Sequence, residues 1–229
     1  MEPTIEFNPS FSMLTLQLSP GEAVKAEPGA MAAQQDVDMK TGMSGGLFGG
    51  FKRMLTSESF FLNTFTAGPT GGWVSLAPPM PGDILSHDVG PGQELFIQSS
   101  SFLACSENVQ TDAKFQGFKG LFSGESLFFL RIFTEGGGSG TVYFNSYGAI
   151  KQLPVTPGKE LVVDTGHVVA FTNDVEYSIG KVGGLGSLIA GGEGLVMKFK
   201  GYGHVWVQTR TLSALADKIV PFLPSAKSE

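Results

Sequence analysis

Short stretches of alternating apolar and polar residues recur along the chain. MLTLQL, ELVVD, HVVAF, TVYFN and HVWVQ place apolar side chains at every second position or in short runs. This spacing is typical of strands buried on one or both faces, because successive side chains of a strand point to opposite faces of the sheet. Turn residues separate such stretches at roughly 8 to 12 residues, which favours a sandwich or barrel. The pattern therefore predicts an all-β protein.

A longer pattern occurs three times. A Pro-Gly turn precedes a strand-like run at Gly21, Gly92 and Gly158, which lie 71 and 66 residues apart. Each turn is followed by a second strand-like run, a glycine-leucine segment, an acidic residue with an apolar run, and a glycine hairpin leading into an aromatic strand. The period exceeds the usual solenoid range of about 20 to 50 residues. We therefore expect one compact domain, 1–229, with three repeats (about 13–80, 81–148 and 149–211). Each repeat is expected to be a short double-stranded β-helix or β-sandwich unit, placed about a pseudo-threefold axis.

The C-terminal stretch TLSALADKIVPFLP departs from the strand pattern. Its apolar residues follow a helical period, beginning after Thr211, a favourable N-cap, and stopping near Pro221. The sequence predicts an amphipathic helix over 212–223. Its apolar stripe consists of Leu212, Leu215, Ala216, Ile219 and Val220.

The glycine-leucine segments also have helical spacing. GGLFGGFKRML in the first repeat puts its apolar residues on one side of two helical turns, and the later repeats shorten this stripe. Burial of each large apolar side chain is worth about 1.5–3 kcal/mol, so the stripe requires a dry surface. Two interpretations stay open: packing in the protein's own core or subunit interface, or contact with a protein partner or a peripheral membrane surface. The candidate interaction surface comprises Leu47, Phe48, Phe51, Met54, Leu55, Leu121, Phe122, Leu185 and Leu188.

Composition narrows the class of partner. The net charge of −6 and a pI near 5.1 argue against nucleic acid, whose binding rests on clustered Lys and Arg. The single Cys105 permits no internal disulfide and, in FLACSE, is typical of a small buried residue. No apolar run approaches the roughly 18 residues of a membrane span, and MEPTIEFNPSFSML lacks a basic targeting region. We expect no signal or transit peptide, and a cytoplasmic protein that is at most peripheral to a membrane.

Candidate chemistry is sparse. GMSGG, 42–46, matches the nucleophile elbow G-x-S-x-G, but no buried parallel strand precedes it, so Ser44 is interpreted as a turn residue. His87, His167 and His204 occupy inequivalent places in the repeats, and a lone imidazole binds a divalent ion weakly. No phosphate-loop motif occurs. The sequence predicts no catalytic site, no metal and no cofactor, and thus a protein that is not an enzyme.

One acidic residue recurs at a comparable place in each repeat. Three carboxylates converging on a pseudo-threefold axis would suit a hard cation. An acid beside a glycine turn more often accepts backbone N–H bonds or faces water, and that interpretation leads. The candidate polar cluster is Glu58, Glu125 and Glu193.

These motifs together resemble a known family. The threefold Pro-Gly pattern, GGLFGGF with SESFFLNTF after it, and GESLFFLRIF are similar to the family called altered inheritance of mitochondria, member twenty-four. The resemblance covers roughly Met13 to Phe222. It implies a fold like that of the trp RNA-binding attenuation protein, repeated three times and often assembled into oligomers. It implies little chemistry, and the link of mitochondrial relatives with inner-membrane organisation is an analogy here.

Two hypotheses of function follow. The first is a non-catalytic scaffold or interaction protein that forms homo-oligomers and acts at a membrane face or in complex assembly. The alternative is a module that binds a small ligand, or less readily RNA, in clefts between repeats or subunits. A polar, convergent cleft at each junction between repeats would favour the ligand, and a contiguous exposed apolar patch would favour the partner.

Overall fold

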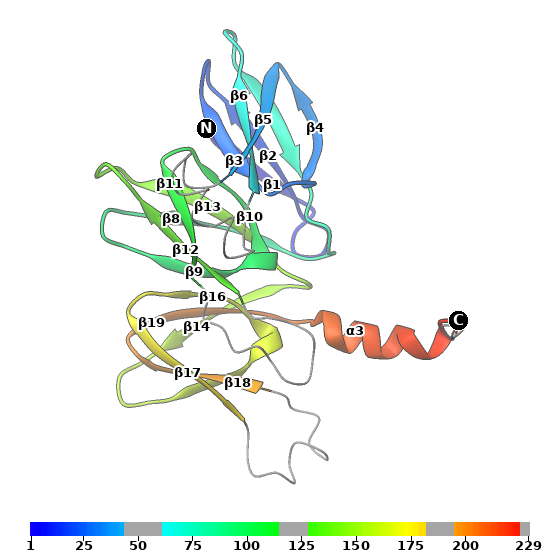
Figure 1. Cartoon of the computed structure of the whole chain (residues 1–229), viewed down its shortest axis with the longest axis vertical. Coiled ribbons are helices and arrows are strands. Elements are labelled where there is room, and N and C mark those ends of the chain that lie inside the picture. Colours follow the sequence, from blue (N-terminus) through cyan, green and yellow to red (C-terminus); the bar gives the residue numbers. More distant parts are fainter. Residues whose placement is uncertain (44–60, 115–127, 182–194, 225–229) are drawn as a thin grey trace.

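The described part of the protein consists mostly of β-strands. A computed structural model describes residues 1–43, 61–114, 128–181 and 195–224 of the 229-residue chain. Within them, four sheets lie one after another along the long axis, and one α-helix, α3, projects from the side (Figure 1). The prediction of a mostly β protein that ends in one short helix is confirmed.

Strand order defines the four sheets. The first contains β1 (Glu2–Glu6), β2 (Met13–Leu18), β7 (Gly72–Leu76) and β4 (Met31–Gln35). The second contains β5 (Val37–Met43), β6 (Phe61–Ala67), β3 (Ala23–Ala26), β10 (Phe102–Ser106), β13 (Gly140–Asn145) and β8 (Ile84–Val89). The third contains β11 (Val109–Lys114), β12 (Phe129–Thr134), β9 (Leu95–Gln98), β16 (Val168–Thr172), β19 (Gly203–Gln208) and β14 (Ile150–Val155). The fourth contains β15 (Leu161–Asp164), β18 (Leu195–Gly201) and β17 (Val175–Lys181).

Eighteen of these strands form three strand sets: β2 to β7, β8 to β13 and β14 to β19. In every set the first strand pairs with the sixth, the sixth with the third, the second with the fifth and the fifth with the fourth. The third strand shifts register against the sixth in each set, between Met31 and Ala33, Phe102 and Ala104, and Val168 and Ala170. The pseudo-threefold arrangement of these sets stays a prediction.

Neighbouring sets are joined by further strand pairing. The second strand of one set pairs antiparallel with the third strand of the next, as β3 with β10 and β9 with β16. Each six-stranded sheet therefore belongs to two sets, which makes the body continuous along its long axis.

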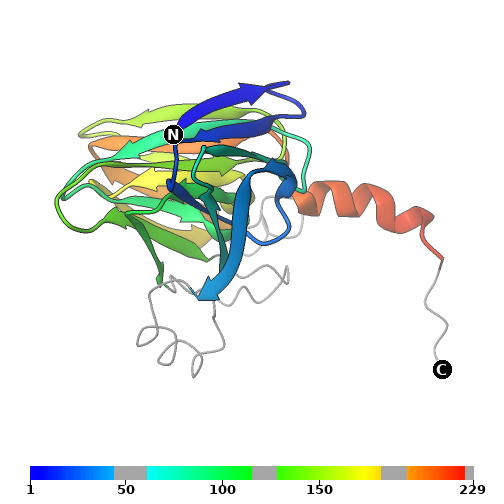
Figure 2. The ribbon, with the colours of Figure 1, turned by 90° about the horizontal axis from the view of Figure 1, so that it is seen from above.

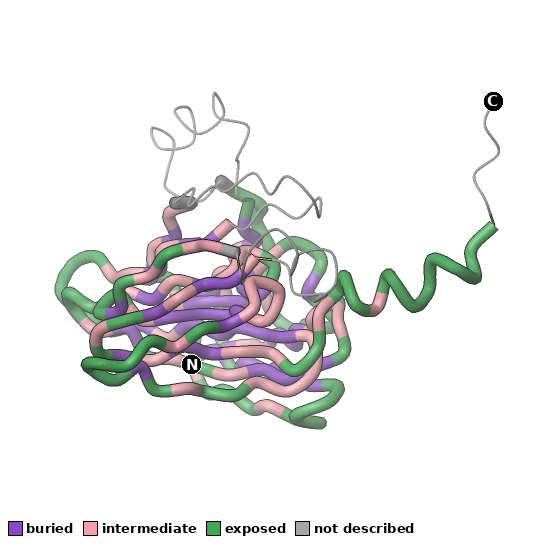
Figure 3. The backbone as a smooth tube through the Cα atoms, turned by 90° about the horizontal axis from the view of Figure 1, so that it is seen from below, coloured by how far each residue is buried: buried purple, intermediate pink, exposed green. Residues whose placement is uncertain are grey.

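The core follows the alternation seen in the sequence. In β2 the side chains of Leu14, Leu16 and Leu18 are buried, and the intervening residues are less so. The buried apolar residues of the described ranges form three clusters, and purple buried backbone fills the interior of the body in Figure 3. Burying apolar area is the main favourable term in folding, so these clusters hold the sheets together.

The C-terminal helix begins where its cap predicts. α3 spans Leu212–Ile219, and the Thr211 hydroxyl accepts a hydrogen bond from the Ala214 N–H at 3.3 Å. A 3₁₀ turn, η3 (Val220–Phe222), contains Pro221 and ends the helical stretch. None of the α3 residues is buried, and the helix points away from the sheets in Figure 2.

Candidate interaction surface

The predicted interaction residues lie outside the described residues. These are Leu47, Phe48, Phe51, Met54, Leu55, Leu121, Phe122, Leu185 and Leu188, and the same holds for Ser44 and for Glu58, Glu125 and Glu193. The structure does describe the strands on either side of each glycine-leucine segment. Each segment connects two strands that pair antiparallel: β5 with β6, β11 with β12 and β17 with β18.

These strands stay paired up to the start of each segment. The outermost pairs are Met43 with Phe61, Lys114 with Phe129, and Lys181 with Leu195. The ends of β5 and β11 point to the same side of the molecule in Figure 2. The hairpins thus position the attachment points of the segments.

Apolar side chains are exposed at the base of the first segment. Met39 on β5 and Phe61 on β6 are each 46% exposed. Residues 39 and 43 lie on one face of β5, and Phe61 pairs with residue 43, so Met39 and Phe61 share a face of the hairpin. The hairpin therefore exposes apolar side chains on one face next to the start of the first segment.

Carboxylates that follow two of the Pro-Gly turns are paired with basic residues. Glu94 accepts a hydrogen bond from Nε of Arg131 at 2.7 Å and a second bond from Nη2, and this pairing raises the pKa of Arg131. Glu160 is held by Lys200 at 3.1 Å and Lys198 at 3.6 Å, and the hydrogen bond with Lys200 lowers its pKa. Each glutamate immediately precedes the second strand of its set and its basic partners lie on the fifth, so these pairs have a structural role at the strand ends.

Two of the three histidines meet at one tryptophan. His87 contacts the Trp206 ring edge-on, with centroids 5.3 Å apart, and His204 lies 6.1 Å from the same ring. Burial lowers the pKa of His87, Asp88 opposes this, and His204 adds to the lowering. His167 is engaged elsewhere, with Nδ1 2.7 Å from the Gln208 carbonyl oxygen. No sequence pattern indicates that His87 and His204 are neighbours, since only strand packing brings them together.

Metal ligands do not gather in the described part of the chain, where no three His, Cys, Asp or Glu side chains form a group suited to an ion. Cys105 is fully buried, and burial raises its pKa to about 12. A thiol with that pKa stays protonated near neutral pH and is a poor nucleophile.

A polar cleft lies at the corner between β4 and β5 and the turn between β6 and β7. It has a volume of about 330 Å³ and is lined by Asp36, Val37, Asp38, Gly68, Pro69 and Thr70. Asp36 adopts a left-handed backbone, with φ of 56°, and its carbonyl oxygen accepts a hydrogen bond from the Gly68 N–H at 2.9 Å. The cleft belongs to one strand set, whereas the ligand hypothesis expects clefts between repeats or subunits.

The helix α3 offers a second apolar surface. Leu212 and Ile219 are each 45% exposed, and the following η3 exposes Phe222 at 87%. No helix among the described residues is both long and apolar enough to cross a bilayer.

Known proteins share this sequence and architecture. Residues 4–210 match the family described as mitochondrial biogenesis AIM24. The chain is 30% identical over 234 residues to an uncharacterized protein of Streptococcus pyogenes serotype M6, covering 98% of this chain and 92% of that protein. It is also similar to a crystal structure of a Streptococcus pyogenes protein, with a TM-score of 0.77 and 28% identity over 97% of this chain and 99% of the other.

Proposed function

The chain belongs to the mitochondrial biogenesis AIM24 family, and from that premise we propose that it is a non-catalytic scaffold that presents its three glycine-leucine segments to a partner protein or a membrane face. One observation carries this proposal. All three segments lie between the fourth and fifth strands of a set in the sequence, and each of these two strands is paired with the other up to its last described strand residue. Three similar apolar segments on equivalent supports are suited to binding one extended surface.

The proposal treats the three strand sets as copies of one unit. It is supported by the shared pairing order, by the register shift before Ala33, Ala104 and Ala170, and by the Pro-Gly turns. Gly21, Gly92 and Gly158 all have positive φ, at 73°, 77° and 79°, which glycine adopts without strain. A unit copied twice would place one binding segment per copy.

The described side chains favour binding over catalysis. The carboxylates of Glu94 and Glu160 are engaged with basic residues, His167 is bound to a backbone carbonyl, and Cys105 is a buried thiol. A catalytic acid, base or nucleophile needs access to substrate and a suitable pKa. The two carboxylates and His167 instead join neighbouring segments of the body, in keeping with a scaffold.

The test is charge substitution in the first segment. Phe48→Asp combined with Phe51→Asp is expected to abolish capture of host proteins, or flotation with phosphatidylcholine and phosphatidylglycerol vesicles, while the circular dichroism spectrum stays unchanged. Phe11→Asp is the matched control, because Phe11 is 73% exposed and lies outside the segments. If the double variant unfolds, the segment packs in the core and the scaffold proposal fails. Retained binding by a folded double variant also contradicts it.

A small-ligand function is the second candidate, and the cleft beside Asp36 is the observation that favours it. Two aspartates in about 330 Å³ would suit a small cationic molecule and would repel nucleic-acid phosphates. Titration calorimetry with putrescine, repeated on Asp36→Asn with Asp38→Asn, tests this. Binding that survives the double substitution would place the ligand elsewhere.

A further inference from the structure

Two edge strands of the body correspond in strand order to the two strands that form each internal junction. Among the described residues, β4 ends the first sheet and pairs with β7, and β15 ends the fourth sheet and pairs with β18. β4 lies toward one end of the long axis and β18, the partner of β15, toward the other (Figure 1). We propose that β4 of one copy pairs antiparallel with β15 of a second copy, so that the chain assembles head to tail. This inference deepens the proposed function and rests on it, because both treat the three strand sets as copies of one unit.

The first internal junction shows how such a pair forms. β10 is the third strand of its set, as β4 is of the first set, and β3 is the second strand, as β15 is of the third set. β10 and β3 pair with Ala104 opposite Ala26 and Cys105 opposite Lys25. The Glu27 N–H also donates to the Leu103 carbonyl oxygen at 2.9 Å, so backbone bonding continues past the strand end.

The second internal junction repeats this register. β16 and β9 pair with Ala170 opposite Ile97 and Phe171 opposite Phe96. In both junctions the alanine that follows the register shift of the third strand lies opposite the fifth residue after the glycine of the Pro-Gly turn, Ala26 after Gly21 and Ile97 after Gly92. The same chain therefore makes this contact twice with unrelated side chains, which indicates that backbone geometry specifies it.

The register of the proposed contact follows from the same positions. Ala33 follows the shift in β4, and Val163 is the fifth residue after Gly158, so these two are expected to lie opposite each other. Gln34 is then opposite Val162, as Cys105 is opposite Lys25 and Phe171 is opposite Phe96. The contact would join the two end sheets into one seven-stranded sheet, β17-β18-β15 of one copy followed by β4-β7-β2-β1 of the next.

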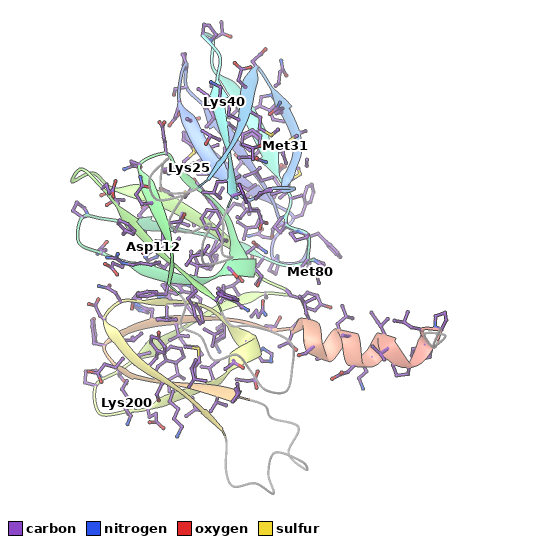
Figure 4. The ribbon with its side chains drawn as sticks, viewed as in Figure 1. Lys25, Met31, Lys40, Met80, Asp112 and Lys200 are labelled. Carbon is purple, nitrogen blue, oxygen red and sulfur yellow. The ribbon has the colours of Figure 1, made fainter. Side chains whose placement is uncertain are left out.

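Burial indicates that this contact is incomplete in one chain. All five residues of β4 are exposed, although four of five are buried in its counterparts β10 and β16. Val162 is 47% exposed on β15. Figure 4 labels Met31 on β4 and Lys200 on β18, which lie far apart in one molecule, so one chain does not close the junction on itself. An unprotected strand edge is a template for another strand, and charged or proline residues that would block it are missing from MAAQQ.

The symmetry of the contact is also defined. β4 and β15 are different surfaces, so the pairing is heterologous and yields a ring if its rotation closes or an open chain if it does not. A second copy is the partner because it carries the matching strand in the matching register.

Cysteine cross-linking tests the contact directly. Gln34→Cys and Val162→Cys are purified as separate proteins, checked by circular dichroism, mixed and oxidised with copper phenanthroline. Directly opposed residues in neighbouring strands lie close enough for a disulfide. Native Cys105 is not expected to form a disulfide under these conditions, because it is fully buried and protonated. The expected result is a covalent dimer in the mixture and monomer in each variant alone.

Controls separate the possible outcomes. Lys151 is an exposed residue of β14, which is another sheet edge. A mixture of Lys151→Cys with Gln34→Cys is expected to stay monomeric. Equal cross-linking with Lys151→Cys, or a dimer from Gln34→Cys alone, would overturn the proposal. Light scattering gives a second readout: the wild-type mass should rise above 24.2 kDa with concentration, while Val162→Lys stays at 24.2 kDa. A wild-type protein that is monomeric throughout overturns the inference.

Failure of this inference is distinguishable from failure of the scaffold function. The cross-link reports on β4 and β15 only, so it should persist in the variant with Phe48→Asp and Phe51→Asp. Retained partner capture by that variant, together with a retained cross-link, would contradict the scaffold alone. Lost partner capture without any cross-link would contradict the head-to-tail assembly alone.

Discussion

Phe96 and Phe171 lie opposite each other across the junction of β9 and β16, with ring centroids 5.1 Å apart and planes only 17° from parallel. Phe171 also contacts the rings of Phe129, Tyr177 and Phe199 from three further strands. One side chain thus joins the second strand set to the third. The junction is held by its core as well as by backbone hydrogen bonds.

Truncation of this side chain should weaken the junction strongly. Phe171 is fully buried, and Phe171→Ala removes its ring contacts and leaves a cavity. We expect a loss of about 3–5 kcal/mol in the free energy of unfolding, measured by urea denaturation. Phe11→Ala at a 73% exposed position is the matched control and should change it by less than about 0.5 kcal/mol. Equal effects of the two substitutions would contradict the central role of Phe171.

A glycine at the start of the second strand set leaves no room for a side chain. A Cβ on Gly82 would lie 1.9 Å from the Ser146 carbonyl oxygen. Because that atom is backbone, Gly82→Ala must displace the chain around Gly148, with which Gly82 forms a bridge. We expect a loss of about 1–3 kcal/mol, read from thermal unfolding.

Gly42→Ala is the control for this substitution. A Cβ on Gly42 would meet nothing within 4 Å. The melting temperature of the Gly42→Ala protein should match or exceed that of the wild type, since alanine restricts the conformations of the unfolded chain. A Gly82→Ala protein as stable as Gly42→Ala would show that the turn can move.

Sequence reasoning succeeded where a local signal was strong. MLTLQL became β2, and the stripe after Thr211 became α3 with the expected cap. It did not anticipate β1, whose EPTIE is mostly exposed and carries no alternation, because that strand forms by pairing with β2. Nor does periodicity reveal which strands end a sheet. The open edges of β4 and β15, like the meeting of His87 and His204 at Trp206, depend on contacts between residues distant in sequence.

The C-terminal helix should be dispensable for the stability of the body. No residue of α3 is buried, so deletion of 212–229 exposes little core. We expect the melting temperature of the truncated protein to stay within about 2 °C of the wild type, because a loss below 0.5 kcal/mol shifts it only slightly. A large drop would show that the helix packs on the sheets in solution.

The cap itself predicts a local effect on that helix. Thr211→Ala removes the acceptor for the Ala214 N–H and should destabilise α3 by about 1 kcal/mol. Hydrogen exchange of the amides of α3 should become faster, while exchange in β19 stays unchanged. Thr209→Ser is a suitable control, since it keeps the hydroxyl that accepts from the Ala149 N–H.

The stability of the body should fall as pH rises toward neutrality because of Glu27. Burial raises the pKa of this carboxyl from its ordinary 4.5 to about 7, so the folded state holds a proton that the unfolded state releases. Its stabilising contribution is complete below about pH 4.5 and is lost as pH rises through 7. Glu27→Gln should remove this loss, and its stability relative to the wild type should therefore increase between pH 5 and pH 7.5 in urea titrations. Because the pKa of His87 is lowered, its contribution to stability rises with pH below its ordinary pKa of 6.5. The wild type and Glu27→Gln both contain His87, so this contribution cancels when their stabilities are compared. A difference that stays constant across this range would mean that Glu27 ionises normally at the start of the β3–β10 junction.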